Sequence, residues 1–192
     1  MPVLIPLTAV AFALAIRWLR RRDGLTVPRA VVAAVACVYG AGILSHVLLP
    51  YPIGTSSGES WRVWLHLTPF VDVVDDPIGI VLNVALFVPL GVLLPLIGGV
   101  RSLGRALLLG FLVSLGIEVV QFLSAVTVSE GRIADVDDLI GNSLGVLLGY
   151  VGFRLAVRVP AVARLTALAT WPPPVSPSPP SGRSSVPAGD GS

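Results

Sequence analysis

Two hydrogen-bonding side chains stand inside a long apolar run of this sequence. The run FLVSLGIEVVQFLSAV covers residues 111–126 and contains Glu118 and Gln121 among aliphatic and aromatic residues. A carboxyl group in such surroundings can act as a general acid or base, and intramembrane acids also carry protons. The spacing of Ser114, Glu118 and Gln121 places all three on one face of a helix. We therefore interpret this face as the centre of the chemistry.

Acidic and amide side chains recur at the beginnings of two other apolar runs. A lone Asn or Gln in a membrane helix often only joins neighbouring helices, at about 0.6 to 2 kcal/mol. Here the polar groups of three helices are expected at similar depths, which favours one shared polar pocket. Arg132 could pair with a carboxylate there. The candidate ligand-binding residues are Asn83, Glu118, Gln121, Arg132, Asp135, Asp138 and Asn142.

The composition indicates that a membrane surrounds these residues. The chain has 192 residues, of which 54% are hydrophobic and 12% are charged, whereas about 25% charged residues is usual in soluble domains. Its mean hydropathy is +0.87. The basic residues flank apolar runs and form no single patch, which argues against a nucleic-acid partner. The single cysteine, Cys37, excludes an intramolecular disulfide.

Five apolar stretches approach the roughly 20 residues that a helix needs to cross a bilayer. We therefore predict an all-α membrane protein, a bundle of about five transmembrane helices. Pro89 and Pro95 are compatible with this reading, because neighbouring helices can satisfy the carbonyl groups that they leave free. The predicted spans are Pro2–Leu19, Ala30–Pro50, Ile78–Ile97, Ala106–Val126 and Leu139–Leu155.

The arginines predict the direction of these spans. They concentrate after the first, third and fifth spans, and only Arg62 and Arg132 occupy the alternate loops. Because cytoplasmic loops carry the excess of positive charge, we expect the N-terminus outside and the C-terminus in the cytoplasm. The polar pocket would then open to the outer surface.

Three regions follow from this division. Residues 1–30 would form an N-terminal anchor helix and a basic cytoplasmic loop, and residues 31–158 the main transmembrane domain. Residues 159–192 would be a disordered cytoplasmic tail rich in Pro and Ser.

The predicted last span contains a glycine repeat, formed by Gly141, Gly145 and Gly149. This spacing lets another helix approach closely, and a homodimer face is the alternative. His66 is interpreted as an ordinary interfacial histidine.

Three segments together resemble the VanZ-like family of membrane proteins. They are NVALFVPLGVLLPL from Asn83, SLGIEVVQF from Ser114 and GRIADVDDLIGNSLGVLLGY from Gly131. The order and spacing match the family pattern at Glu118 and Gln121, and again from Arg132 through Gly145. The resemblance covers about residues 45–153. It implies a multi-pass protein of the bacterial plasma membrane. It also implies a link to resistance against teicoplanin, a glycopeptide antibiotic with an acyl chain.

Two classes of function remain open at this point. In the first, the outer pocket binds a lipid-linked or acylated amphiphile without turnover, and membrane lipids are the other partners. In the second, the protein is an enzyme acting on an envelope lipid, with Glu118 as the catalytic acid or base. Proton-coupled transport ranks third. In the enzyme hypothesis Asp135 and Asp138 could hold a divalent metal near a phosphate headgroup, with water and substrate completing their incomplete oxygen shell. The sequence contains no complete set of metal ligands, so we predict no metal or cofactor.

Overall fold

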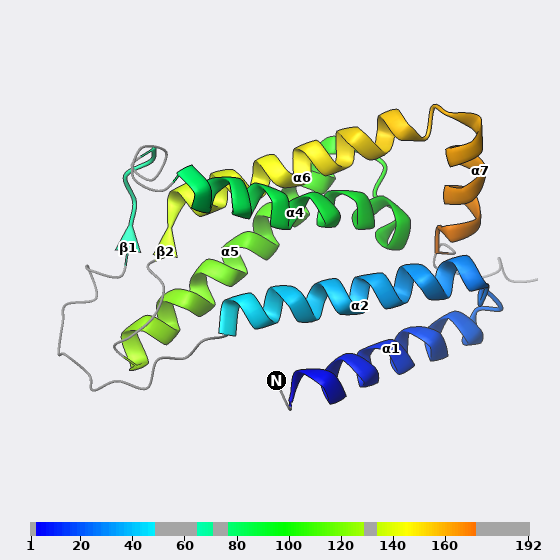
Figure 1. The fold of residues 1–192 in the computed structure, drawn as a ribbon, viewed down its shortest axis with the longest axis horizontal. Coiled ribbons are helices and arrows are strands. Elements are labelled where there is room, and N and C mark those ends of the chain that lie inside the picture. The colour runs from blue at the N-terminus through cyan, green and yellow to red at the C-terminus, as the bar shows by residue number, and fades with distance from the viewer. Residues whose placement is uncertain (1–2, 49–64, 71–76, 129–133, 172–192) are drawn as a thin grey trace, which may run out of the picture.

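The computed structural model describes residues 3–48, 65–70, 77–128 and 134–171, and these residues are almost entirely helical (Figure 1). A hairpin of α1 and α2 forms one edge of the molecule, and α4, α5 and α6 form the other part. The helices are α1 (Leu4–Arg21), α2 (Val27–Leu48), α4 (Pro77–Gly98), α5 (Leu103–Val128), α6 (Val136–Ala156) and α7 (Pro160–Ala169).

Four of these helices are long and apolar enough to cross a membrane. Their apolar windows have mean hydropathies of 1.8 for α2, 2.6 for α4, 2.1 for α5 and 1.4 for α6. Much of their apolar surface faces outward, as at Val81, Leu112 and Leu148, which suits contact with lipid tails. The all-α membrane fold is thus confirmed. The first expected span is helical as α1, but its end carries Arg17, Arg20 and Arg21, and its crossing of the membrane stays a prediction.

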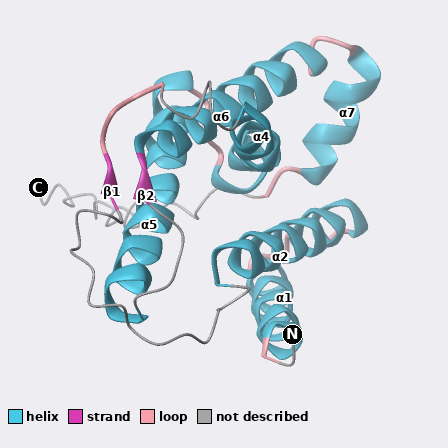
Figure 2. Ribbon diagram, turned by 60° about the vertical axis from the view of Figure 1, so that its left-hand side comes forward, coloured by secondary structure: helices cyan, strands magenta, loops and turns pink. Residues whose placement is uncertain are grey.

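Helices α4 and α6 run parallel, side by side, and pack with their backbones in contact (Figures 1 and 2). Gly145 and Gly149 of α6 lie directly against the carbonyl groups of Val84 and Val88, so a Cβ atom at either glycine would collide with backbone. Gly91 of α4 makes the reciprocal close approach to α6. Small residues permit this approach because they leave no side chain between the helices.

Helix α5 crosses this pair in the opposite direction and closes its core. Gly110 of α5 lies against the side chain of Val146, and the buried cluster below it contains Phe87, Val100, Ala106 and Tyr150. The hydroxyl group of Tyr39 in α2 donates to the carbonyl oxygen of Leu86 at 2.8 Å, which ties the α1–α2 hairpin to α4.

Two short segments outside the helices pair as parallel strands. They are β1 (Leu65–His66) and β2 (Ala134–Asp135), with Leu65 opposite Ala134 and His66 opposite Asp135. Figure 2 shows the pair beside α5, next to the beginning of α6. This pairing adds a local feature to the all-α fold and brings His66 to the first residues of α6.

The expectation of a disordered tail over residues 159–192 is wrong for its first part, because residues 160–169 form α7. Pro160 occupies the start of this helix, where its fixed φ is favourable and its missing N–H is not needed. The chain then returns to the bundle, and the N–H of Trp171 donates to the carbonyl oxygen of Leu96 at 2.8 Å. Residues 172–192 lie outside the described residues.

Candidate functional site

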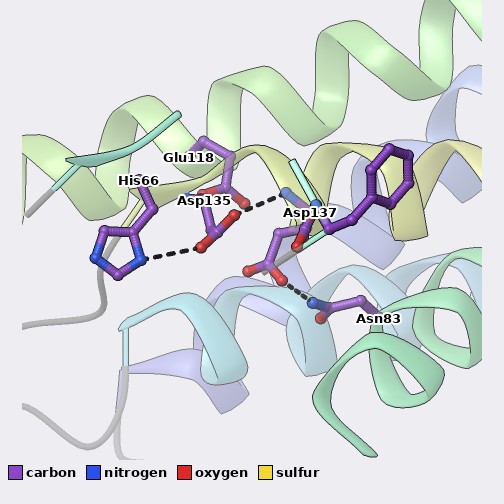
Figure 3. A network of polar contacts seen from close by, with 7 residues as sticks. His66, Asn83, Glu118, Asp135 and Asp137 are labelled. Atoms are coloured by element: carbon purple, nitrogen blue, oxygen red, sulfur yellow. Dashed lines mark hydrogen bonds and ion pairs between the residues drawn. The ribbon is translucent and has the colours of Figure 1, made fainter. Parts of the chain in front are cut away.

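The candidate site lies where β1, α5, β2 and the beginnings of α4 and α6 meet (Figure 3). Helix α5 contributes the face that carries Ser114, Glu118 and Gln121. These three side chains are buried, and Glu118 and Gln121 each keep only 5% of their surface exposed. Their neighbours Val119 and Leu123 point outward. The helical spacing of the polar residues therefore does orient them together toward the bundle.

Asp135 connects three elements through one carboxylate and one backbone N–H. It is the N-cap of α6, with extended backbone angles, and its Oδ1 accepts from the N–H of Asp137 at 2.8 Å. Its Oδ2 lies 3.3 Å from Nδ1 of His66. Its own N–H donates to Oε2 of Glu118 at 3.2 Å. Asp135 thus joins β1 and α5 to the beginning of α6.

Glu118 is held by the backbone of β2 and is not left exposed to lipid. An ionised carboxylate in the hydrocarbon region is costly unless it faces the bundle interior and finds polar partners. The hydrogen bond from the Asp135 N–H supplies such a partner. The arrangement suits a carboxyl group that can accept or release a proton while its position stays constant.

The sequence predicts that His66 is an ordinary interfacial histidine, yet its side chain takes part in this cluster. Its side chain is 47% exposed while its Nδ1 faces the buried carboxylate of Asp135. That contact leaves the second ring nitrogen, Nε2, for another group. Local spacing in the sequence could not predict this role of His66, because the pairing of β1 with β2 joins residues that are far apart in the sequence.

Asp137 is a second residue that the sequence did not single out. Only 2% of its surface is exposed, and its Oδ1 accepts from the N–H of Phe70 at 2.6 Å. Phe70 has a φ of 68°, in the left-handed region that bulky residues rarely adopt. The buried carboxylate therefore coincides with a strained backbone position, and such positions persist where surrounding contacts hold them.

The amide side chains form contacts between helices. Nδ2 of Asn83 in α4 donates to Oδ1 of Asp138 in α6, and Nδ2 of Asn142 donates to Oγ of Ser114 in α5 at 2.9 Å. Within the described part of the chain, Oε1 of Gln121 and Oδ1 of Asn142 are buried without a hydrogen-bond partner. Buried acceptors of this kind are costly, so a water or another polar group would stabilise them.

A cavity of about 210 Å³ adjoins the acidic cluster. Of the predicted binding residues, Glu118 and Asp135 line it and Asn83, Gln121, Asp138 and Asn142 do not, while Arg132 lies outside the described residues. The rest of its wall, apart from His66, is apolar. Its lining residues are Leu65, His66, Leu67, Leu115, Glu118, Val119, Phe122, Asp135, Val136 and Leu139.

The described side chains of the cluster do not adopt an arrangement typical of a metal centre. Among the residues that the structure describes, no group of three or more His, Cys, Asp or Glu side chains is placed to hold a metal ion. The carboxylates accept hydrogen bonds from backbone N–H groups and from the amide of Asn83. The geometry can bind a group that offers hydrogen-bond donors, and it can move a proton through Glu118 or His66.

Comparison with known proteins adds one positive finding. Residues 31–157, more than half of the chain, match the family model described as VanZ/LLP1. The match begins in α2 and ends just after α6, so it includes every element of the candidate site. No curated protein and no solved structure matches the chain.

Proposed function

Because the chain belongs to the VanZ/LLP1 family of membrane proteins, we propose that it binds an amphiphile of the bacterial cell envelope at the cavity between β1, α5 and α6. The acyl part of the amphiphile occupies the apolar portion of the cavity, and its polar head meets His66, Asp135 and Glu118. The location that we propose is the bacterial plasma membrane. The observation that supports this proposal is the composition of the cavity wall, which is apolar except for these three polar side chains.

The chemistry of the wall limits the ligand. Side chains such as Leu67, Leu115 and Phe122 offer no hydrogen bonds and favour contact with hydrocarbon. The carboxylates accept hydrogen bonds, so they prefer a head with hydroxyl or amine groups. These preferences fit a lipid-linked or acylated sugar better than a fully apolar molecule.

Two adjacent valines of α5 provide a direct test with a matched control. Val119 lines the cavity and Val120 does not, although their exposed fractions are similar, at 48% and 42%. The probe is an N-acyl glucosamine with a diazirine in its chain, added to the full chain in zwitterionic nanodiscs. We expect Val119→Trp to lower the cross-linking affinity about tenfold, equivalent to 1.4 kcal/mol. Val120→Trp should match wild type, and equal labelling of all three proteins would contradict the proposal.

Antibiotic sensitivity tests the finer form of the proposal. The acyl chain of teicoplanin makes this glycopeptide one ligand for the cavity. A sensitive host would carry empty vector, wild type or Glu118→Gln at matched membrane levels, and would be exposed to teicoplanin or vancomycin. Selective protection against teicoplanin that Glu118→Gln removes would support resistance through this site. Equal sensitivity with vector and with folded wild type would exclude resistance for this protein.

A second candidate function is catalysis on an envelope lipid. The observation that favours it is the pair of His66 and Asp135 next to Glu118, since a carboxylate often orients a histidine that transfers protons. Glu118→Gln keeps an oxygen that can accept from the N–H of Asp135 but cannot donate an acidic proton. Product formation from envelope lipids that Glu118→Gln abolishes, with retained binding of the acyl probe, would favour the enzyme over the binding protein.

A further inference from the structure

A second cavity lies at the opposite end of the α4–α6 pair. Its volume is about 940 Å³, and it opens between the end of α4, the beginning of α5 and the turn that follows α6. Sixteen positions separate Asp138 from Arg154 along α6, or roughly 24 Å at the helical rise of about 1.5 Å per residue. This second cavity is therefore distinct from the acidic cluster. It shares no described lining residue with the smaller cavity that adjoins the acidic cluster.

Arginine side chains from two separate turns line this second cavity. Arg101 and Arg105 come from the α4–α5 connection and the first turn of α5, and Arg154 and Arg158 come from the end of α6 and the turn after it. No Asp or Glu that the structure describes belongs to the lining. Within the described ranges, none of these four guanidinium groups forms an ion pair.

Arg154 is held in position by neutral groups. Its Nη1 donates to the carbonyl oxygen of Arg101 at 3.1 Å and to the hydroxyl of Tyr150 at 3.4 Å, and its guanidinium lies 6.0 Å from the centre of the Tyr150 ring. These contacts orient the side chain and leave its charge uncompensated. Like charges that converge on one cavity repel each other, so an anion between them is stabilised.

Two tryptophans complete the wall on the side of α1 and α7. The rings of Trp18 and Trp171 lie 5.2 Å apart, and both residues line the cavity. Nε1 of Trp171 is buried and has no acceptor among the described residues. Tryptophans are enriched at the level of lipid headgroups. The remaining wall is largely apolar, with Pro95, Val100 and Phe153.

We propose that this second cavity is a binding site for the phosphate headgroup of an anionic phospholipid. The arginine guanidinium groups donate to phosphate oxygens, and the apolar wall contacts the first carbons of the acyl chains. The volume exceeds what a single phosphate ion fills, and the cavity lies at the ends of helices that are long and apolar enough to cross a membrane. A lipid supplies both the charge and the apolar surface that such a site requires. The proposal does not depend on the function proposed for the acidic cluster.

The test measures retention of lipid by the purified full chain. The protein is placed in nanodiscs of phosphatidylcholine that contain increasing fractions of phosphatidylglycerol. The protein is then released from the nanodiscs, and native mass spectrometry counts the phosphatidylglycerol molecules that stay bound to it. The informative variant is Arg105→Gln/Arg158→Gln, since neither side chain donates a hydrogen bond to a residue that the structure describes. We expect its affinity for phosphatidylglycerol to fall about thirtyfold, because the variant removes two positive charges that attract an anionic headgroup.

Two controls make the outcome decisive. Arg164→Gln removes one charge from α7 outside the cavity lining and should leave retention within about twofold of wild type, because screening weakens distant charges. Arg105→Lys/Arg158→Lys keeps the charge and should retain most of the affinity, which shows that the Gln variant fails through charge and not through misfolding. Equal retention by wild type and the double Gln variant would overturn the proposal. So would displacement of the lipid by millimolar inorganic phosphate, since the site would then bind a soluble anion.

Discussion

At the beginning of α6 the side chains of Asp135 and Asp137 are buried and hydrogen-bonded, whereas at the end of the same helix arginines line an open cavity. At the first end, groups of the chain itself form hydrogen bonds with the charged side chains. Backbone N–H groups of Phe70, Asp135 and Asp137 donate to carboxylates. The second end offers donors but no internal anion within the described residues. One end is therefore built to hold a fixed polar cluster, and the other to receive charge from outside.

Both ends depend on the same glycine-lined contact, so disturbing it should have the largest effect. Gly149→Ala would place a Cβ atom against the carbonyl of Val88, and we expect a loss of about 1–3 kcal/mol in unfolding free energy from overpacking. Gly152→Ala, three residues further along α6, meets no atom within 4 Å. It should be neutral or raise stability by up to about 1 kcal/mol, because Ala favours the helix.

The measurement is the thermal transition of purified protein in one detergent, followed by circular dichroism. Amphiphile cross-linking and phosphatidylglycerol retention should fall together in Gly149→Ala if the helix pair supports both ends. Loss at one end alone would show that the two ends are positioned independently. A smaller loss of stability in Gly149→Ala than in Gly152→Ala would contradict the role of the close contact.

An intermediate effect is expected at the acidic end from the N-cap of α6. Asp135→Ala removes the acceptor for the N–H of Asp137 and the partner of His66, at a cost of about 0.5–2 kcal/mol. Asp135→Asn keeps the cap and loses only the charge, so most of the stability should remain. The unfolding midpoints of the two variants in the same detergent provide the measurement. Equal destabilisation by Ala and Asn would mean that the charge near His66, and not the cap, dominates.

The smallest effect on stability should come from a substitution at the arginine end, and the size of this effect should depend on the lipid. Arg158 is exposed and donates no side-chain hydrogen bond to another described residue. In phosphatidylcholine, Arg158→Gln should change the unfolding free energy by less than about 0.5 kcal/mol. With added phosphatidylglycerol, wild type should gain stability and the variant should gain less, because a ligand stabilises the state that binds it. If phosphatidylglycerol stabilised wild type and Arg158→Gln equally, the arginine end would not differ from the acidic end by receiving an external anion.

Several features could be predicted because they depend on local spacing. The helical period placed Ser114, Glu118 and Gln121 on one face, and the structure buries all three. The repeated glycines of α6 indicated a close helix contact, and Gly145 and Gly149 lie on the α4 backbone. Helix α7 was missed because a nearby tail rich in Pro and Ser dominated the composition of residues 159–192.

The membrane environment, the approximate limits of the long helices and the polar face of α5 can all be read from the amino-acid sequence. These follow from hydrophobic length and from the period of the helix, which are properties of single segments. Three further features emerge from the packing of the folded chain. His66 contacts Asp135, Asp137 accepts a hydrogen bond from the strained Phe70, and arginines from two distant turns line one cavity. The reason is physical. These contacts link residues separated by many positions, and the packing of helices, not the local pattern, sets the distances between them.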